Sequence, residues 1–220
     1  MSNFFGVLTS PTATFERIRA NGKGWVLALI VMVLLSVLAL WVQQDAIVGT
    51  IEDEFVRQEA KGVEIDQNIR DIAIASATIF SYFTAVVSVV LTMFIGGLLL
   101  LLVNLFVRGE ATYMQLSKVA LYSYIPSLLS MLVTGIIAYS TGATTMFDVM
   151  LNAGAFIEDK TSMLFVLAQM LDPFRIWGLV VMIIGTAVMT RKGRGSVATW
   201  IVIGWLLITF LTLLSSRAAA

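Results

Sequence analysis

The stretch IAIASATIFSYFTAVVSVVLTMFIGGLLLLLVNLFV, residues 72–107, decides the fold class of this chain, because none of its 36 residues is charged. A helix that crosses the roughly 30 Å hydrocarbon core of a bilayer needs about 20 predominantly apolar residues. As one helix this stretch would be about 54 Å long, so it must tilt, project beyond the bilayer or break. If the helix breaks, we expect the break at Gly96-Gly97.

Further apolar stretches of membrane-spanning length lie on both sides of it. The five predicted spans cover about residues 25–42, 72–107, 119–139, 174–190 and 197–214. Trp25 and Trp41 lie at the two ends of the first span, where indole rings favour the membrane interface. We therefore predict an all-α, polytopic membrane helical bundle of five transmembrane helices, with residues 1–220 forming a single membrane domain. Residues 191–196 are too few for anything but an antiparallel hairpin between the last two spans.

Composition agrees with a membrane protein and argues against an enzyme. Apolar residues make up 59% of the chain and charged residues 13%, against roughly 25% charged in soluble domains. Cysteine and histidine are absent, which removes thiolate and imidazole ligands, cysteine nucleophiles and the usual general base. We expect no catalytic residues, metal site or cofactor. The net charge of zero gives no reason to expect nucleic acid as a partner.

The placement of charges orients the bundle. Cytoplasmic loops near span ends are enriched in Lys and Arg. The loops on the N-terminal side of the five-span chain carry eight basic and two acidic residues, and those on the opposite side carry six basic and twelve acidic ones. We therefore predict a bacterial inner-membrane protein with its N-terminus in the cytoplasm and its C-terminus outside.

Residues 1–24 are predicted to contain an interfacial amphipathic helix on the inner surface. Ser10 before Pro11 is a favoured N-cap, and residues 21–22, Asn-Gly, provide a stop. Phe15 and Ile18 then share one face. The basic residues elsewhere on this segment are predicted to face anionic lipid; they are Arg17, Arg19 and Lys23.

Two segments on the outer side are also predicted to be helical. Residues 43–71 form an acidic outer segment, in which Ile47, Ile51 and Phe55 recur at i, i+4 and i+8 and indicate an amphipathic helix. The apolar stretch 162–171 is too short to span the bilayer. We expect it to be an interfacial helix that leads into the fourth span.

Three stretches share their order and spacing with a known group of membrane proteins. They are PTATFERI at 11–18, GEATY at 109–113 before ALYSYIPS at 120–127, and LDPFRIW at 171–177 before IG at 184–185 and GSVA at 195–198. In this order, with five spans, they resemble the Yip family, named for Ypt-interacting proteins, in its bacterial branch. The stretches cover most of the chain outside residues 43–71.

The resemblance implies a non-enzymatic five-span protein. Eukaryotic relatives are associated with small Rab-type GTPases and vesicle traffic, and the role of the bacterial branch is largely undefined. Because the chain lacks the long cytosolic N-terminal region of the eukaryotic members, we do not expect a Rab-type GTPase as its partner. The expected partners are membrane lipids and other membrane proteins, or a second copy of this chain.

Polar side chains inside the spans are candidates for functional or packing positions. Tyr122, Ser123, Tyr124 and Pro126 form a polar patch in the third span, where the proline should kink the helix and free the carbonyl of residue 122. Asn104 is the most polar side chain of the second span. Such residues either line a cavity or make hydrogen bonds between helices.

Asp172, Arg175 and Trp177 form a third candidate group, at the outer mouth of the fourth span. Asp172 and Arg175 could form an ion pair that fixes this entry. The alternative is that the aspartate caps the helix start and Trp177 anchors it at the interface.

We hypothesise a membrane scaffold or accessory protein that binds other membrane proteins or organises lipid. The alternative is a channel or permease component for a small solute or peptide, which would require the polar residues of spans two and three to face one water-filled cavity. A third hypothesis, an intramembrane enzyme using Lys118 with a nearby serine, has no supporting motif.

Overall fold

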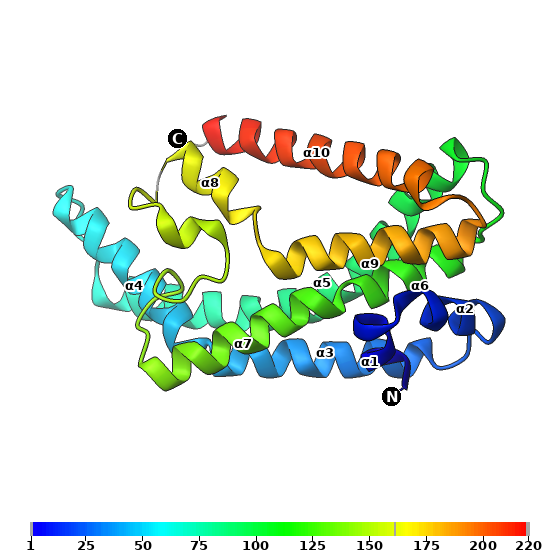
Figure 1. Ribbon diagram of the computed structural model, residues 1–220. Helices are drawn as coiled ribbons and strands as arrows, with labels where there is room; N and C mark the ends of the chain where they lie inside the picture. The colour runs from blue at the N-terminus through cyan, green and yellow to red at the C-terminus, as the bar shows by residue number, and fades with distance from the viewer. Residues whose placement is uncertain (1, 161, 219–220) are drawn as a thin grey trace.

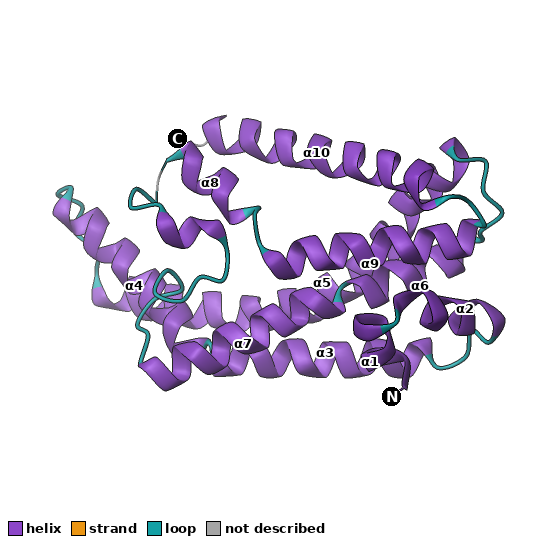
Figure 2. Ribbon diagram, viewed as in Figure 1, coloured by secondary structure: helices purple, strands orange, loops and turns teal. Residues whose placement is uncertain are grey.

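The computed structural model describes residues 2–160 and 162–218, and within these residues the secondary structure is entirely helical. Figure 2 shows helices joined by loops, and Figure 1 shows that the long helices run side by side. The first helix and the end of the last helix lie at opposite ends of the bundle (Figure 1). We call the end with residues 2–24, 107–112 and 191–193 the basic end, and the end with residues 43–66 and 142–172 the acidic end.

Within the described part of the chain, five helical segments are long and apolar enough to cross a membrane. They are α3 (Trp25–Val42), α5 (Gln67–Phe106), α6 (Tyr113–Ser123) continued by α7 (Ile125–Thr141), α9 (Pro173–Thr190) and α10 (Arg194–Ala218). The predicted all-α polytopic bundle is thereby confirmed. The first span begins and ends at the predicted residues.

The second span does not break. α5 is one helix of 40 residues that passes through Gly96-Gly97, so of the three alternatives the break does not occur. The glycines serve close packing instead, since a Cβ on Gly96 would lie 2.8 Å from the Cβ of Ala120, and one on Gly97 would lie 2.8 Å from the Cα of Ser117. Small residues at such positions let two membrane helices approach until their backbones nearly touch.

The third span is interrupted at Tyr124, between α6 and α7. Pro126 lies in the first turn of α7, where its missing amide hydrogen removes a bond that would otherwise continue the helix. The predicted kink before Pro126 is confirmed. Opposite the interruption, a Cβ on Gly178 of α9 would lie 2.9 Å from the carbonyl oxygen of Ser123, so this glycine lets α9 pack directly on the break.

The N-terminal segment forms two helices, α1 (Ser2–Thr9) and α2 (Pro11–Ala20). α2 has the predicted bounds, although the side chain of Ser10 makes no capping hydrogen bond, and α1 was not predicted. Phe15 is fully buried and Ile18 nearly so, and α2 packs against α9. The apolar face of α2 therefore lies on protein, whereas the sequence predicted a face left for lipid.

The core lies between α2, α5, α6 and α9, towards the basic end. Met93, Leu116 and Val181 are fully buried there, together with Phe15. Gly185 of α9 makes room for the phenylalanine, because a Cβ at this position would lie 2.7 Å from its ring. α6 is the most buried of the spanning segments, with all residues from Leu116 to Ser123 inside.

At the acidic end, α4 (Gln44–Ala60) is the predicted amphipathic helix of the acidic outer segment. It is tied to the bundle by Arg70, which pairs with Glu59 and lies 5.6 Å from the ring centroid of Phe55. The segment before α9 holds a short 3₁₀ helix, η1 (Ala153–Phe156), and α8 (Met163–Gln169), which confirms the helix predicted at 162–171.

α10 diverges from the other spans towards the acidic end (Figure 1). Near the shared turn it is well packed, since Trp200 stacks on Phe106 with ring centroids 4.3 Å apart and Val197 and Ile201 are buried. Beyond that point its large apolar side chains are exposed; they include Ile203, Leu206, Leu207, Ile208 and Phe210. α10 is thus attached to the bundle mainly at the basic end.

Candidate functional site

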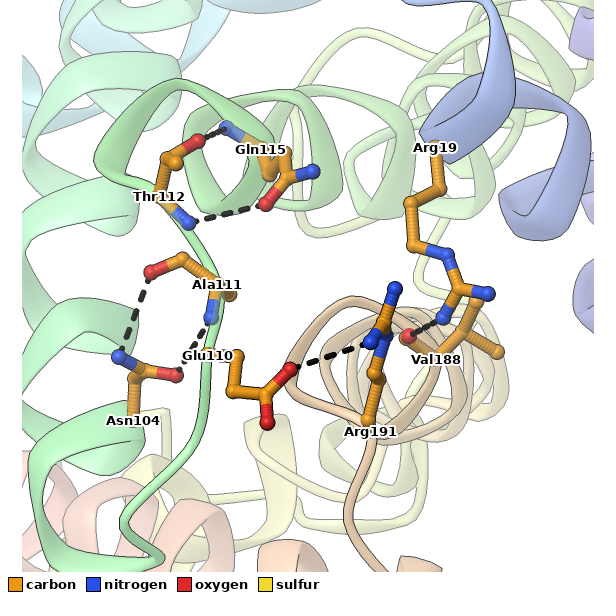
Figure 3. Close-up of polar contacts among 8 residues, drawn as sticks. All are labelled: Arg19, Asn104, Glu110, Ala111, Thr112, Gln115, Val188 and Arg191. Carbon is orange, nitrogen blue, oxygen red and sulfur yellow. Dashed lines mark hydrogen bonds and ion pairs between the residues drawn. The ribbon is translucent and has the colours of Figure 1, made fainter.

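The polar contacts of the basic end converge on a small group of residues from four helices and from the segments that follow α5 and α9. We call this group the basic-end junction; it consists of Arg19, Asn104, Glu110, Ala111, Thr112, Gln115, Val188 and Arg191 (Figure 3). The group joins the end of α5, the start of α6 and the end of α9, and α2 reaches it through its arginine.

Asn104 fixes the loop between α5 and α6. Its Oδ1 accepts the amide hydrogen of Ala111 at 3.2 Å, and its Nδ2 donates to the carbonyl of the same residue at 3.4 Å. α6 then begins with a capping box, in which the Thr112 hydroxyl accepts from the amide of Gln115 and the glutamine side chain accepts from the amide of Thr112. Asn104 thus bonds to a residue seven positions later and holds this loop against the end of α5.

The same loop packs tightly against the end of α9. The amide of Glu110 donates to the carbonyl of Thr190 at 3.3 Å. A Cβ on Gly109 would lie 2.7 Å from the Cβ of Thr190, so only glycine allows this approach. The Glu110 carboxylate also pairs with Arg191 at 3.2 Å, but both side chains are mostly exposed, and such pairs contribute only about 0–1 kcal/mol.

Two helices at the basic end stop at an arginine in the left-handed backbone conformation. Arg108 follows α5 with φ 53° and Arg191 follows α9 with φ 57°. The next amide in each case closes the helix, from Gly109 to the carbonyl of Asn104 and from Lys192 to the carbonyl of Ala187. A residue with a Cβ has a steric cost in this conformation. Both helices therefore end at a cationic residue in a position where glycine would be less strained.

The three basic residues predicted to face lipid lie at the basic end and differ in their contacts. Arg17 donates to the Thr14 hydroxyl at 3.0 Å. Arg19 donates to the carbonyl of Val188 at 2.7 Å and so joins α2 to the last turn of α9. Lys23 is exposed in the loop before α3. At least Arg19 therefore holds two helices together.

Lys118 was not predicted to hold the fold. It is only 9% exposed, and its Nζ donates to the carbonyl of Gly22 at 2.9 Å, across 96 residues of sequence. This bond occupies the amine that the enzyme hypothesis would have used. The sequence indicates one half of this contact, because Asn21-Gly22 ends a helix and the last carbonyls of a helix attract basic side chains.

The polar patch of the third span is divided by the interruption. Tyr122 and Ser123 are each 4% exposed and lie within the helix packing, and Pro126 is also buried. Tyr124 turns towards α3 and α5, and its hydroxyl donates to the sulfur of Met131 at 3.6 Å. Tyr122 and Ser123 therefore lie in helix packing, whereas Asn104 belongs to the loop contacts of the basic end.

The group at the start of α9 is organised around a helix cap. The Asp172 carboxylate accepts the amide hydrogens of Phe174 at 2.8 Å and Arg175 at 3.3 Å. Within the described part of the chain, the Arg175 side chain forms no ion pair with this carboxylate. Arg175 and Trp177 are exposed. Of the two alternatives, the cap is the one that the structure shows.

A second anchored carboxylate lies at the acidic end. The Asp148 carboxylate accepts hydrogen bonds from the amides of Thr145 at 2.7 Å and Thr144 at 2.9 Å, and from the Thr144 hydroxyl. These bonds, the one from the Thr145 backbone most of all, hold the pKa of Asp148 below its ordinary value of 3.8. The contacts are local and shape one loop.

Chemically, these polar groups fix helix ends and loops, since most of their side chains bond to backbone atoms. Among the described residues, no cluster of three or more carboxylates has metal-binding geometry. The exposed cations of the basic end remain available to anionic groups of the bilayer or of a neighbouring protein; they include Lys23, Arg108, Lys192 and Arg194.

Comparison with known proteins gives two matches over almost the whole chain. The family model described as the Yip1 domain matches residues 5–216. The membrane protein YknW of Bacillus subtilis (strain 168) is 30% identical over 228 residues, which cover 99% of this chain and 93% of that protein. No solved structure matches the chain.

Proposed function

The chain belongs to the Yip1 domain family, and on this premise we propose that it is a non-enzymatic scaffold or accessory protein that holds other membrane proteins or organises lipid around them. The relative from Bacillus subtilis is named only as a membrane protein, so the proposal depends on the geometry of this chain.

The use of the polar side chains within the spans carries the proposal. A permease would need Tyr122, Ser123 and Asn104 to face one water-filled path. Tyr122 and Ser123 are instead buried in helix packing, and Asn104 bonds to the backbone of Ala111. Side chains used in this way stabilise the arrangement of the helices. This use of the polar side chains supports a scaffold that offers binding surfaces to other membrane proteins, in preference to a permease that conducts a solute.

The two ends of the bundle offer surfaces of opposite charge to neighbouring membrane proteins. Exposed Lys and Arg gather around α2 and the two turns of the basic end, whereas α4 carries Glu52, Asp53, Glu54 and Glu59 into the outer solution. Complementary charges speed the encounter of two proteins and fix their relative position more than they increase the binding affinity. A partner with acidic residues near one face of the membrane and basic residues near the other would fit both ends.

We propose that the basic end is cytoplasmic, as the distribution of Lys and Arg predicts. The chain has no cysteine, so single cysteines can report sidedness. In sealed inner-membrane vesicles that expose the cytoplasmic face, Gly193→Cys should react with an impermeant maleimide and Gly142→Cys should not. Reaction of both cysteines, or of Gly142→Cys alone, would contradict the orientation.

The scaffold proposal predicts specific protein neighbours. The tagged chain should be extracted with its native lipid in polymer nanodiscs and compared by quantitative mass spectrometry with an unrelated five-span protein expressed at the same level. We expect a reproducible set of membrane proteins to be enriched with this chain alone. Equal recovery of all membrane proteins by the two baits would remove support for the scaffold.

The permease alternative has its own test. The purified chain should be reconstituted into vesicles loaded with a mixture of small dyes, amino acids and short peptides. We expect release no faster than from protein-free vesicles. Rapid release of one class of solute would favour the alternative.

A further inference from the structure

A pocket of about 420 Å³ lies between α3, α5 and α7, within the membrane-spanning part of the bundle. We call it the Ser36 pocket; the residues that matter here are Ser36, Leu40, Phe80, Thr84, Tyr124 and Met131. Its volume falls in the range of pockets that bind small molecules in proteins, roughly 300–1,000 Å³.

Ser36 is the unusual member of this pocket. The residue is only 1% exposed, and its Oγ makes no hydrogen bond of full geometry among the described residues, although it lies close to the Tyr124 hydroxyl. Two other serines of the pocket differ, since Ser81 donates to the carbonyl of Thr78 and Ser88 to that of Ala85, both within α5. A buried hydroxyl without a partner is costly in an apolar environment, so a ligand that supplies one is favoured.

Tyr124 adds a second hydroxyl to the same pocket. Its hydrogen bond goes to the sulfur of Met131 at 3.6 Å, and a thioether is a weak acceptor. An oxygen acceptor would compete well for this proton. Ser36 and Tyr124 therefore offer two donors to one oxygen atom that enters between α3 and α7.

The remaining features define the rest of the ligand. Among the described residues that line the pocket none is charged, which favours a neutral polar group. Leu40, Phe80 and Met131 provide apolar walls. The lining residues of α5 run from Ala77 to Ser88, which is about 16 Å of helix. Phe80 is 66% exposed on the outer surface of α5, so the pocket is reached sideways from the hydrocarbon of the bilayer.

We propose that the Ser36 pocket binds one acyl chain of a bilayer glycerolipid, with the ester carbonyl of that chain accepting hydrogen bonds from Ser36 and Tyr124. An acyl chain has the elongated apolar shape of the pocket, and its ester supplies one neutral oxygen acceptor. The inference goes beyond the scaffold function, which requires only that the chain lies in a bilayer.

The experiment compares lipids with and without the carbonyl. The chain is purified in mild detergent, supplied with dioleoyl phosphatidylglycerol or with its ether-linked analogue, and the retained lipid is counted by native mass spectrometry. We expect the wild type to retain the ester lipid about sevenfold better, the ratio given by two average hydrogen bonds in a membrane protein. Equal retention of the two lipids would overturn the proposal.

Substitutions distinguish the contribution of the hydroxyl groups to lipid retention from that of the pocket as a whole. Ser36→Ala should lower the preference for the ester lipid part of the way, because Tyr124 still donates, and the double variant Ser36→Ala/Tyr124→Phe should retain the two lipids equally. Ser81→Ala is the matched control, because the hydroxyl it removes is already bonded within α5, and it should retain the wild-type preference. Thr84→Phe should fill the pocket and exclude both lipids. Melting temperatures identify any variant that is misfolded.

A second measurement distinguishes a lipid from a protein occupant. A photoreactive side chain at Phe80, at the mouth of the pocket, should form adducts with lipid in native membranes. Adducts with a protein segment in place of lipid would show that a transmembrane helix of a partner fills the pocket, and would overturn the proposal. Unchanged ester preference in Ser36→Ala would also overturn it.

Discussion

The two ends of the bundle are held together by different kinds of contact. At the basic end, hydrogen bonds join segments far apart in sequence, with 169 residues between Arg19 and Val188 and 182 between Arg194 and Thr12. At the acidic end most bonds are local, such as those of Lys160 to the carbonyls six and three residues before it. Contacts between distant segments are lost only when the bundle opens, whereas local contacts can form and break within one loop.

This difference suggests that the basic end fixes the arrangement of the spans and the acidic end adapts. α2, α6 and α9 meet at the basic end around Phe15, and α10 is attached there through Val197 and Trp200. The acidic end has cross-links as well, from the amide of Met146 to the Thr50 hydroxyl at 2.8 Å and from the Gln43 side chain to the carbonyl of Met131 at 2.9 Å. Among the described residues, however, none of 43–66 or 142–172 belongs to the hydrophobic core.

The largest expected effect comes from filling the core at the basic end. In Gly185→Leu the new side chain would meet the Phe15 ring at 2.7 Å and Val119 at 2.8 Å. Overpacking of this kind costs about 1–3 kcal/mol or more, so the melting temperature in mild detergent should fall sharply. Gly204→Leu is the control, since no atom lies within 4 Å of that position, and it should be nearly neutral. An equal fall in melting temperature in the two variants would contradict the proposal that the basic end fixes the arrangement of the spans.

A matched pair of lysines tests the two ends directly. Lys118→Met removes a bond between segments 96 residues apart and leaves the Gly22 carbonyl without its donor, which should cost about 1–3 kcal/mol of global stability. Lys160→Met removes two local bonds and should cost less. Hydrogen exchange should show Lys118→Met loosening α2, α3 and α6 together, and Lys160→Met loosening residues 153–160 alone. A global effect of Lys160→Met would contradict the proposed division.

A smaller effect, of opposite sign, is expected at the left-handed arginine after α5. Arg108→Gly removes a steric cost of about 1–2 kcal/mol and adds an entropic cost of about 0.5–1 kcal/mol, so the free energy of unfolding should rise by up to about 1 kcal/mol. Arg108→Ala loses the same charge and keeps the strain, and it should not gain stability. If alanine stabilises as much as glycine, charge repulsion among the cations is the cause.

The smallest expected effect is confined to the loop around Asp148. The bonds from Thr145 and Thr144 lower the pKa of Asp148 in the folded chain. Their contribution is therefore present above the unfolded pKa and is lost as the pH falls through the folded value, which lies below 3.8. Amide exchange of Thr144 and Thr145 should rise only in that acidic range, with the basic end unaffected. Asp148→Asn should abolish this rise in amide exchange at acidic pH. If the rise persists in the variant, another group causes it.

The spans could be predicted because their signal is local. An apolar run of sufficient length needs no knowledge of its neighbours, and the first span has the predicted bounds from Trp25 to Val42. The interruption before Pro126 was predictable for the same reason, since the missing amide hydrogen belongs to the proline itself.

The failures concern features that depend on a partner elsewhere in the chain. Gly96-Gly97 is compatible with a break or with close packing, and only the position of Ser117 and Ala120 opposite it decides between them. The bond of Arg19 to the carbonyl of Val188 was not predicted, because that carbonyl lies 169 residues away. Tyr122 and Tyr124 looked equivalent in sequence, but the interruption turns one into the core and the other towards the Ser36 pocket.

The unbroken α5 has a consequence for the shape of the membrane itself. α3 has 18 residues and matches a hydrocarbon layer of about 27 Å, whereas the uncharged stretch 72–106 within α5 is about 53 Å long. Near its acidic end, α5 exposes Ile72, Ile79 and Phe80. Covering them requires lipid to rise along α5, or the whole bundle to tilt. Either adjustment costs less in a thick bilayer, so the chain should partition towards the thicker regions of its membrane.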